Sequence, residues 1–446
     1  MTPPKPASRP RRVSLWRHFR AFRNDILSSQ PEHLFKARMA EFKTPFFRSF
    51  LVNEPDLVSE VLKRRPSDFP KSNRVVEGLR PLLGDAVFVT NGETWARQRR
   101  IIDPAFDASF QRELLPSIKA AAQTAAARLE PGTIEVEAWA SRGAADAIFR
   151  ALFSVPIDDA LALATFNAFH TYQRSQPLLN LAAFLPLPRW VPRCHRPAAR
   201  AAARAIRASI TAMVRDRLGE ITAGRAPKDL ATRIMNTPDP ATGVGFAEQE
   251  MVDQVAIFFL AGHETSAAAL SWALYLLATH PEAQASVAAE ARDFWSEGGG
   301  QSLSQLGFAR DVFRETLRLY PPVPMMVREA RQPGFFRGRR VKRGAQVVVS
   351  PWHLQRNPRH WSAPDAFDPW RWSLGGRGAA KDAYLPFSTG PRVCPGTSFA
   401  MAEGVLFLSS VLARWRLSPV QNFEPVPVAY LTLRSQDGII LELSRR

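Results

Sequence analysis

The hydrophobic and polar positions of this chain follow helical periods over most of its length. The longest such pattern covers 248–279, is apolar on nearly every side and stops before Pro281, which predicts one long buried helix. A shorter helix is predicted over 310–319, because Tyr320 precedes two prolines and proline disfavours helical backbone in the residue before it. Three more segments have a helical composition and lie over 92–104, 119–129 and 198–218.

Strand patterns are fewer and shorter. β-branched runs between turn residues predict strands within three segments, 325–330, 339–352 and 428–443. No linker or internal repeat divides the chain. We therefore expect a mainly α fold with small β-sheets (α+β), built as one large domain over 31–446. The basic, proline-rich stretch 1–30 is expected to be disordered or loosely packed.

Composition narrows the class of protein. The hydrophobic content of 46% is that of a globular protein, and two cysteines exclude a disulfide framework and suit a reducing, cytoplasmic location. The N-terminal stretch has no apolar core, so neither a signal peptide nor a membrane anchor is expected. Lysine and arginine exceed aspartate and glutamate by 59 − 41 = 18, which suits nucleic acid, anionic lipid or an acidic protein. The arginines are spread along the chain, which argues against nucleic acid.

One apolar segment, 176–194, is broken by four prolines. Two interpretations remain open for it. The segment is either a loop packed on the core or a mobile hydrophobic lid over an access channel, and the sequence does not separate them.

Cys394 stands in an unusually constrained setting, the stretch PFSTGPRVCPG. Pro395 suits the first turn of a helix, and a cysteine at a helix N-terminus has its pKa lowered by the helix dipole. Gly390 and Gly396 would let the backbone approach a flat cofactor, and Arg392 can meet an anionic group. The alternative is a small buried hydrophobe, which is how we interpret Cys194.

The spacing of this stretch resembles the haem-binding loop of the cytochrome P-450 family. The matching residues are Phe387, Gly390, Arg392, Cys394 and Gly396. The resemblance implies haem b (iron protoporphyrin IX) with Cys394 as the axial iron ligand, whose electron donation favours O–O cleavage. Ser388 departs from the glycine that many members have after the phenylalanine.

The middle of the long predicted helix carries a second motif, residues 261–265 with the sequence AGHET. Glycine inside a helix costs about 0.5–1 kcal/mol relative to alanine, so some neighbour needs the space. An acid beside a hydroxyl could relay protons. The motif resembles the family's oxygen-activating segment, which implies that Thr265 and Glu264 deliver protons while Ala261 and Gly262 leave room for oxygen.

Two further sets of residues resemble family positions. Glu315 and Arg318 have the spacing of an ion pair on one helix face, and in the family such a pair joins an arginine equivalent to Arg371 in a buried structural triad near the haem. Trp95, Arg99 and Arg328 resemble residues that, with Arg392, hold the haem propionates; the planar fork of arginine suits carboxylates. Gln355 stands where relatives often have a histidine.

The resemblance implies a haem-thiolate monooxygenase of the soluble bacterial type, without a fused reductase. One atom of O2 would enter a lipophilic substrate, and the other would leave as water. Electrons would come from a separate ferredoxin or flavodoxin, with part of the positive charge steering an acidic partner. Pocket residues suggested by analogy are Phe88, Phe258, Phe259, Val323, Met325, Met326 and Tyr430.

Other functions remain open at this point. A peroxygenase or isomerase of the same fold needs no proton relay, so the Glu264–Thr265 pair argues against it. A non-catalytic haem sensor is disfavoured by the same pair and by the basic surface. Nucleic-acid binding is the least supported alternative.

Overall fold

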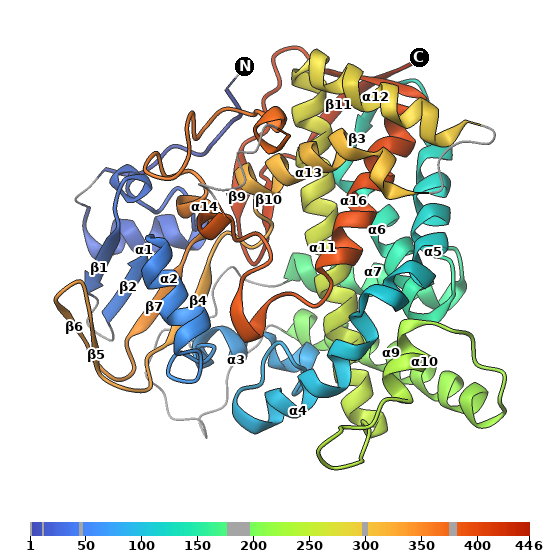
Figure 1. Cartoon of the computed structure of the whole chain (residues 1–446), viewed down its shortest axis with the longest axis horizontal. Helices are drawn as coiled ribbons and strands as arrows, with labels where there is room; N and C mark the ends of the chain where they lie inside the picture. The colour runs from blue at the N-terminus through green and yellow to red at the C-terminus, as the bar shows by residue number, and fades with distance from the viewer. Residues whose placement is uncertain (1, 11–12, 44–47, 176–196, 297–301, 374–380) are drawn as a thin grey trace.

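The computed structural model describes residues 2–10, 13–43, 48–175, 197–296, 302–373 and 381–446. Helices dominate one side of the molecule and a four-stranded sheet the other, with α11 between them (Figure 1). The helices are α1 (Leu15–Asn24), α2 (Pro55–Ser59), α3 (Asn73–Leu83), α4 (Gly92–Ile102), α5 (Ala108–Ala127), α6 (Val136–Phe153), α7 (Ala160–Ser175), α9 (Pro197–Thr222), α10 (Leu230–Met235), α11 (Glu248–Thr279), α12 (Pro281–Trp295), α13 (Gly307–Leu319), α14 (Pro351–Leu354) and α16 (Thr397–Leu412). This confirms the predicted mainly α fold.

The strands are short. They are β1 (Met39–Lys43), β2 (Arg48–Val52), β3 (Gly132–Glu135), β4 (Met326–Glu329), β5 (Gly334–Phe336), β6 (Arg339–Val341), β7 (Gln346–Val349), β8 (Trp415–Pro419), β9 (Pro427–Ala429), β10 (Leu433–Ser435) and β11 (Ile440–Arg445). The largest sheet has the order β1-β2-β7-β4, in which β2 and β7 run parallel and the other pairs antiparallel.

Helix α11 is the centre of the helical part and begins and ends where the sequence predicts. Its first turn is fixed by Glu250, whose carboxylate accepts the Ala247 N–H at 3.0 Å. Its last turn ends at Thr279, before Pro281. Nearly all its residues are buried because α6, α9, α16, α13 and α3 pack around it. A helix covered on all sides needs apolar residues all round, which explains the unbroken hydrophobic pattern.

Helix α5 is longer than predicted. The sequence indicated a helix over 119–129, but the helix starts at Ala108, where the Asp107 carboxylate accepts the Phe110 N–H at 2.8 Å. Pro116 lies inside it, and the burial of Leu114 and Ile118 on one face stabilises the helix across the proline. Tertiary packing thus overrides a local breaker.

A second, smaller core lies under the four-stranded sheet. Phe50 and Val52 of β2 and Val347 and Val349 of β7 are fully buried there. Side chains two residues apart point to the same face of a strand, so these four share the face that covers the cluster. The sheet therefore rests on its own cluster of side chains beside the main helical core.

The division at residue 30 stays a prediction. Described residues on its N-terminal side contact the domain: the Tyr320 hydroxyl donates to the Pro4 carbonyl at 2.7 Å, and Lys5 pairs with Asp365 at 2.9 Å. The predictions for 176–194, including Cys194, lie outside the described residues. No helix among the described residues has the length and apolar character needed to cross a membrane.

Candidate active site

The cysteine loop precedes α16 and is held by its own backbone. The Cys394 N–H donates to the Phe387 carbonyl at 3.0 Å, and the Val393 N–H donates to Gly390 at 3.0 Å. Thr397 in the first turn of α16 donates its hydroxyl to the Cys394 carbonyl at 2.9 Å. These bonds fix a loop that leaves Cys394 exposed, although half-buried Phe387 packs against the main core. The side chain is thus displayed, as a ligand requires.

Gly390 has a different reason for its identity from the one the sequence suggested. Its φ is +74°, and a Cβ there would lie 2.0 Å from the carbonyl oxygen of Leu62, in the π-helical turn Glu60–Arg64. The absent side chain therefore makes room for a neighbouring backbone, with which the loop is in close contact. At Gly396 a Cβ would make only ordinary contacts, with Cys394 and Phe106 at 4.0 Å.

The thiol of Cys394 does not have the lowered pKa that its place before a helix suggested. Although the residue is open to solvent at its surface, the protein atoms packed around the thiol desolvate it and raise its pKa. This outweighs the lowering caused by the Gly396 N–H, Arg99, Thr397 and Lys71. The helix N-terminus alone is therefore not enough to favour the thiolate. A bound metal ion would supply the missing stabilisation, since a coordinated thiol is deprotonated.

Four cations gather beside this loop. Arg392 stacks over Trp95, with its guanidinium carbon 4.1 Å from the ring centroid, and donates to Asn91 Oδ1 at 2.8 Å. Arg328 is 5% exposed and donates to the Val327 carbonyl at 3.3 Å. Lys71 bridges to Arg328 through the backbone, and its ammonium donates to the Phe88 carbonyl at 2.7 Å. Arg99 donates to the Val393 carbonyl at 2.9 Å, which ties it to the loop. We call Lys71, Arg99, Arg328 and Arg392 the cation cluster.

The cation cluster lacks negative charge. Of its members, only Arg99 has a carboxylate partner among the described residues, Asp103 at 2.7 Å. Burial lowers the pKa of Arg328 to about 10, and burial with Arg328, Arg99 and Arg331 lowers that of Arg392 to about 9. The pKa of Lys71 falls well below its usual value through burial and the neighbouring arginines. Buried cations without partners are unfavourable, so this cluster is suited to an anionic ligand with more than one charge.

Helix α11 is open over one turn in its middle. Ala261 is exposed and Thr265 half-exposed, although residues 251–260 and 266–278 are buried. Gly396 adjoins Phe106, and the Phe106 ring lies 5.9 Å from that of Phe258, three residues before Ala261. The cysteine loop and the open turn of α11 are thus linked through two phenylalanines.

Inside that turn, Thr265 and Gly262 differ in what surrounds them. The Thr265 hydroxyl donates to the Ala261 carbonyl at 2.6 Å. A Cβ on Gly262 would lie 2.9 Å from Cδ1 of Ile148, so α6 occupies the space that the glycine leaves. The sequence assigned that space to oxygen, whereas in the structure the glycine permits close packing of two helices. The open room is at Ala261.

Glu264 points to a different neighbourhood from Thr265. Its Oε1 accepts from the Thr432 hydroxyl at 2.6 Å and from Arg434 at 2.7 Å. Glu264 lines a polar cavity of about 190 Å³, together with Glu137, His263 and others from α6, α7 and β10. The two members of the predicted relay therefore share no hydrogen bond, and Glu264 is held by the β9–β10 hairpin.

A second carboxylic acid lies deeper. Glu403 of α16 is fully buried, and one of its oxygens accepts from the Ser266 hydroxyl of α11. Its Oε1 has no partner among the described residues, and burial raises its pKa to about 8. Glu403 is therefore mostly protonated near pH 7, and its partner Ser266 directly follows Thr265 on α11.

The predicted triad forms and is fully buried at its centre. Glu315 pairs with Arg318 at 2.7 Å and with Arg371 at 3.0 Å, and Trp372 donates its indole N–H to Glu315 at 3.0 Å. The remaining Arg318 N–H groups go to three backbone carbonyls, of Gln355, Pro364 and Ala366.

Gln355 extends this network to the cysteine loop. Its amide nitrogen donates to the Leu317 and Arg318 carbonyls at 2.9 and 3.0 Å, and its amide oxygen accepts the Leu385 N–H at 2.6 Å. Leu385 in turn accepts the Ser388 N–H at 3.2 Å. The residue that departs from the family pattern is thus a structural link, which sequence reasoning did not identify.

The suggested pocket residues have different environments. Phe259 lies in the core, with its ring 4.5 Å from those of Phe149 and Phe169. Phe88 lies under the Lys71 ammonium, at 3.5 Å from its ring centroid. Tyr430 is exposed at the β9–β10 turn, and Val323, Met325 and Met326 are half-buried.

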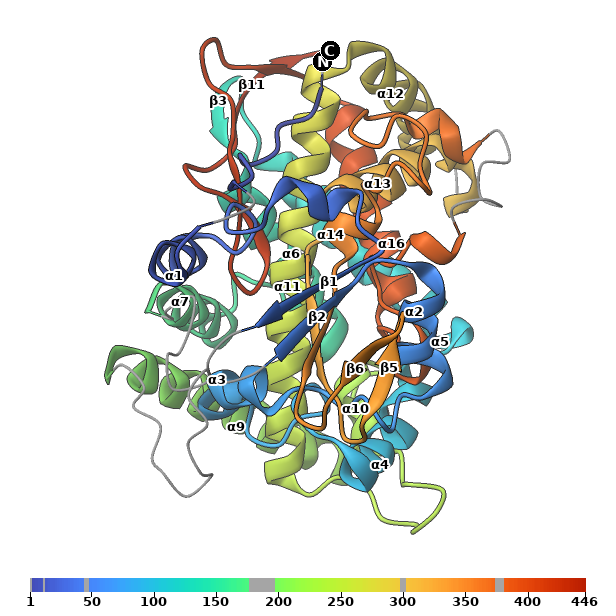
Figure 2. The ribbon, with the colours of Figure 1, turned by 90° about the vertical axis from the view of Figure 1, so that its left-hand side faces the viewer.

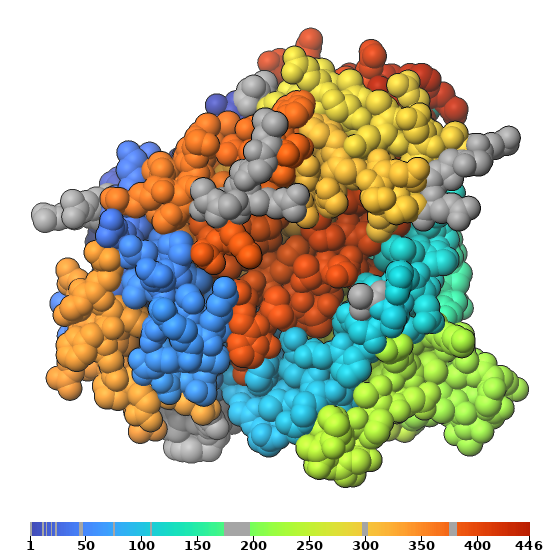
Figure 3. Space-filling model, in the orientation of Figure 1, coloured from blue at the N-terminus to red at the C-terminus, as the bar shows by residue number. Residues whose placement is uncertain are grey.

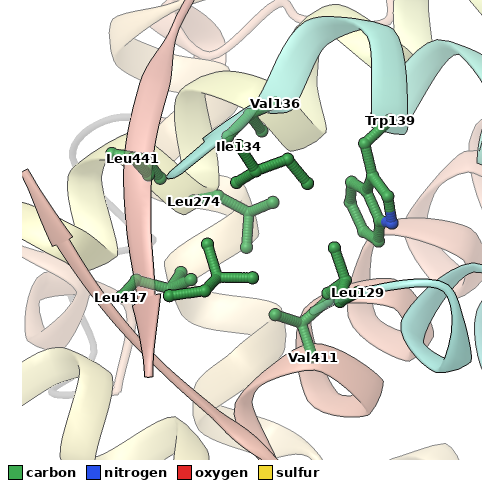
Figure 4. A pocket seen from close by; sticks show the side chains of 9 residues that line it. Leu129, Ile134, Val136, Trp139, Leu274, Val411, Leu417 and Leu441 are labelled. Carbon is green, nitrogen blue, oxygen red and sulfur yellow. The ribbon is translucent and has the colours of Figure 1, made fainter. Parts of the chain in front are cut away.

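Figure 4 shows another cavity, enclosed by hydrocarbon side chains between α6, α11 and the β3-β11-β8 sheet. Its volume is about 10 Å³, which is room for at most one water. The Trp139 N–H beside it is already bonded to the Ala125 carbonyl at 2.9 Å. This gap is a packing defect of the core and holds no group that could orient a ligand.

The cation cluster and the displayed cysteine fit a planar iron cofactor with two carboxylates. Three cations without carboxylate partners match two propionates, and a lone exposed sulfur matches an axial iron ligand. The class defined in this way is that of haem-thiolate proteins.

Comparison with known proteins identifies the family. Residues 15–441 match the profile described as Cytochrome P450. The chain is 32% identical to cyclooctat-9-en-7-ol 5-monooxygenase of Streptomyces melanosporofaciens, over 92% of the chain and 87% of the relative. It is 29% identical to human cytochrome P450 4A11, over 88% and 79%. The cytochrome P450DA heme domain, as an engineered mutant, has the same fold, with a TM-score of 0.83, 22% identity and coverage of 100% and 98%. The chain belongs to the cytochrome P450 family and is a haem-dependent monooxygenase.

Proposed function

We propose that this monooxygenase oxidises a lipophilic small molecule with electrons from a separate acidic protein. The observation that supports this most is the opening of α11 at Ala261 and Thr265, linked through Phe106 and Phe258 to the displayed Cys394. Haem, when bound, supplies the oxidising chemistry. The chain's own residues hold it, exclude water and handle protons.

In this proposal the cation cluster holds the haem carboxylates and Cys394 holds the iron. Arg328 and Arg392 are preorganised by the β4 strand and by stacking on Trp95. Charge-assisted hydrogen bonds from such groups are stronger than neutral ones, so the dianionic edge of the cofactor selects this side of the site.

Proton delivery is assigned to Thr265 and Glu264. Thr265 Oγ1 is fixed by its bond to the Ala261 carbonyl, which leaves its lone pairs toward the open turn. Both bonds to Glu264 reach Oε1, which leaves Oε2 to exchange a proton with water in the polar cavity. Movement of a proton between the two residues requires water between them, because no direct bond joins them.

Two measurements test the haem and relay assignments. The reduced, CO-bound protein should show the red-shifted Soret band of thiolate ligation, and Cys394→Ser should lose it while Cys194→Ser keeps it. Thr265→Ala and Glu264→Gln should each divert electrons to peroxide, with haem binding unchanged. Unchanged coupling in both variants would remove the relay role, and retention of the band in Cys394→Ser would contradict the ligand assignment.

The substrate class rests on a weaker comparison. The name of the Streptomyces relative specifies the oxidation of an unsaturated cyclic alcohol. We propose compounds of that kind, with fatty acids and other terpenoids, as the first set to screen by substrate-induced shifts of the haem spin state. If polar compounds alone changed the haem spin state, the assignment of a lipophilic substrate would be overturned.

The electron donor is proposed to dock on the cysteine side. Figure 3 shows the orange-red C-terminal part of the chain at the floor of a shallow depression between blue and cyan segments. Exposed Lys63 adjoins Gly390 of the cysteine loop, and Arg112 of α5 is also exposed. Opposite charges steer association, so the rate should fall steeply with ionic strength. A cytoplasmic location stays a prediction.

A further inference from the structure

Helix α1 presents an aromatic and basic face that the monooxygenase reaction does not use. Trp16 is 76% exposed, the highest value among the large hydrophobic side chains of the described residues. Trp16 and Arg20 share one face of the helix by their spacing, Arg17 adjoins Trp16, and both arginines are exposed. The opposite face, with half-buried His18 and Phe22, is turned toward the protein.

The charge around this face is one-sided. Residues 1–24 contain seven lysines and arginines and neither aspartate nor glutamate. Arg17 and Arg20 have no carboxylate partner among the described residues. Asp25, the first acid in the chain, is already bonded to the Leu27, Ser28 and Ala429 N–H groups. Among the described residues, no acid pairs with the exposed arginines of α1.

The β5–β6 hairpin provides a comparison within the same molecule. Phe335 there is 72% exposed and is also surrounded by arginines. Arg337 pairs with Glu54 at 2.7 Å, and Arg339 pairs with Glu41 at 3.1 Å. Both sites therefore combine an exposed aromatic residue with basic residues. They differ because Arg337 and Arg339 of the hairpin have carboxylate partners, whereas Arg17 and Arg20 of α1 have none among the described residues.

We propose that α1 docks the enzyme on an anionic lipid surface, with Trp16 in the headgroup layer and Arg17 and Arg20 against lipid phosphates. Indole rings favour the membrane–water boundary, and basic side chains are attracted to anionic leaflets. A short helix with one aromatic and several basic residues lies on a membrane and does not cross it. The binding is peripheral and reversible.

Two features favour lipid over the other partners that a basic face can attract. Nucleic acid gives an exposed indole no apolar layer to enter. An acidic electron donor has to approach the cysteine side, whereas Figure 2 shows α1 with α7 on the left edge and α2 with α5 on the right. The face thus serves a partner other than the electron donor.

The docking helix is bonded to the distal side of the site. Asp25 Oδ1 accepts the Ala429 N–H at 2.8 Å, and the Ile26 N–H donates to the Ala429 carbonyl at 3.2 Å. Ala429 ends β9, and the same hairpin holds Glu264 through Thr432 and Arg434. Docking through α1 would place this hairpin next to the membrane, where lipophilic substrates concentrate. This consequence rests on the proposed function, although the docking itself does not.

The test is sedimentation of the full-length, haem-loaded protein with vesicles of phosphatidylcholine, alone or mixed with phosphatidylglycerol. Wild type should bind the mixed vesicles about tenfold more tightly than the neutral ones. Trp16→Ser and the double variant Arg17→Gln/Arg20→Gln should each weaken binding to mixed vesicles about tenfold, since both side chains contribute to interfacial binding. Their CO-bound spectra and turnover of dissolved substrate should match wild type.

The matched controls are Phe335→Ser and Arg337→Gln/Arg339→Gln, which remove an equally exposed aromatic residue and two paired arginines. They should bind mixed vesicles like wild type. Equal losses in the control and α1 variants would overturn the proposal in favour of overall charge. Absence of binding by wild type, or competition by duplex DNA for the α1 face, would also overturn it. A normal CO-bound spectrum in those cases would leave the haem assignments standing.

Discussion

Two groups of charged residues are connected to the cysteine loop, one through Arg99 and the other through Gln355, and they differ in one respect. Around Glu315, two arginines and an indole N–H surround one carboxylate, and Arg318 uses three backbone carbonyls as well. In the cation cluster, Arg328 and Arg392 have only neutral acceptors. Both groups are built on arginines, and Arg328 is buried as the centre of the first group is. The first group is complete within the chain, and the second lacks the anions that its cations need.

The difference separates structural from binding residues without reference to a ligand. A buried charge paired and hydrogen-bonded in the folded chain contributes to its stability once formed, and removal of one partner leaves the other charge uncompensated. A buried charge without a partner costs stability until a ligand supplies one. Substitutions in the two groups should therefore have opposite effects on the haem-free protein.

The largest effect is expected for Glu315→Gln. Removal of the carboxylate leaves Arg318 and Arg371 uncompensated, so the free energy of unfolding should fall by about 3–5 kcal/mol. Denaturant unfolding of the haem-free protein measures this. The exposed pair Arg337–Glu54 provides the control, because Glu54→Gln should change stability by less than about 1 kcal/mol. Similar losses of unfolding free energy in Glu315→Gln and Glu54→Gln would contradict the distinction between the buried group and an exposed ion pair.

The next effect is expected for Arg328→Gln. Loss of a charge-assisted bond should weaken haem binding about ten- to a hundredfold, since such bonds contribute about 1.5–3 kcal/mol. The haem-free variant should be as stable as wild type or more so, because an unpaired buried cation is gone. Haem transfer to an acceptor protein and unfolding of the haem-free form measure the two quantities. A destabilised haem-free variant with normal haem affinity would place Arg328 with the structural group.

The smallest effect, taken over a single pH unit, concerns Glu403, a buried acid that has, among the described residues, no cation partner and one carboxylate oxygen without a hydrogen bond. Its pKa is about 8 in the folded protein and near 4.5 when unfolded, so the folded state binds the extra proton between these values. Stability is therefore fully present at low pH and falls as pH rises through this window, by up to about 1.4 kcal/mol per pH unit.

Glu403→Gln should flatten this dependence, as unfolding midpoints at two pH values within the window would show. The conservative variant keeps the hydrogen bond to Ser266 and removes only the titration. Equal slopes in the variant and wild type would exclude Glu403 as the source.

The sequence predicted what depends on local pattern. The bounds of α11 follow from an unbroken apolar run and Pro281, and the Glu315–Arg318 pair follows from spacing on one helix turn. Partners distant along the chain were not predicted. No sequence pattern identified Lys71 as a site residue, because its proximity to Arg328 arises from a backbone bridge between segments distant along the chain. Arg434 likewise reaches Glu264 only through the β9–β10 hairpin.

Glycines were the least informative residues when taken alone. Gly262 and Gly390 were both expected to leave space for a cofactor or for oxygen, and both give that space to the protein: Ile148 in one case, the Leu62 carbonyl in the other. A missing Cβ in a sequence indicates that something is close and does not say what it is. The identity of the neighbour depends on the tertiary fold.

The link through Gln355 has a consequence for how the enzyme acquires its cofactor. Because one amide joins the backbone of α13 to Leu385, the loop that displays Cys394 is fully supported only when the segment around Glu315 is assembled as well. A chain that has not completed that assembly offers haem a sulfur held by the loop's own hydrogen bonds alone. Stable haem binding would then indicate that the surrounding protein has folded, so the haem absorbance of a preparation would measure the fraction of correctly folded chains.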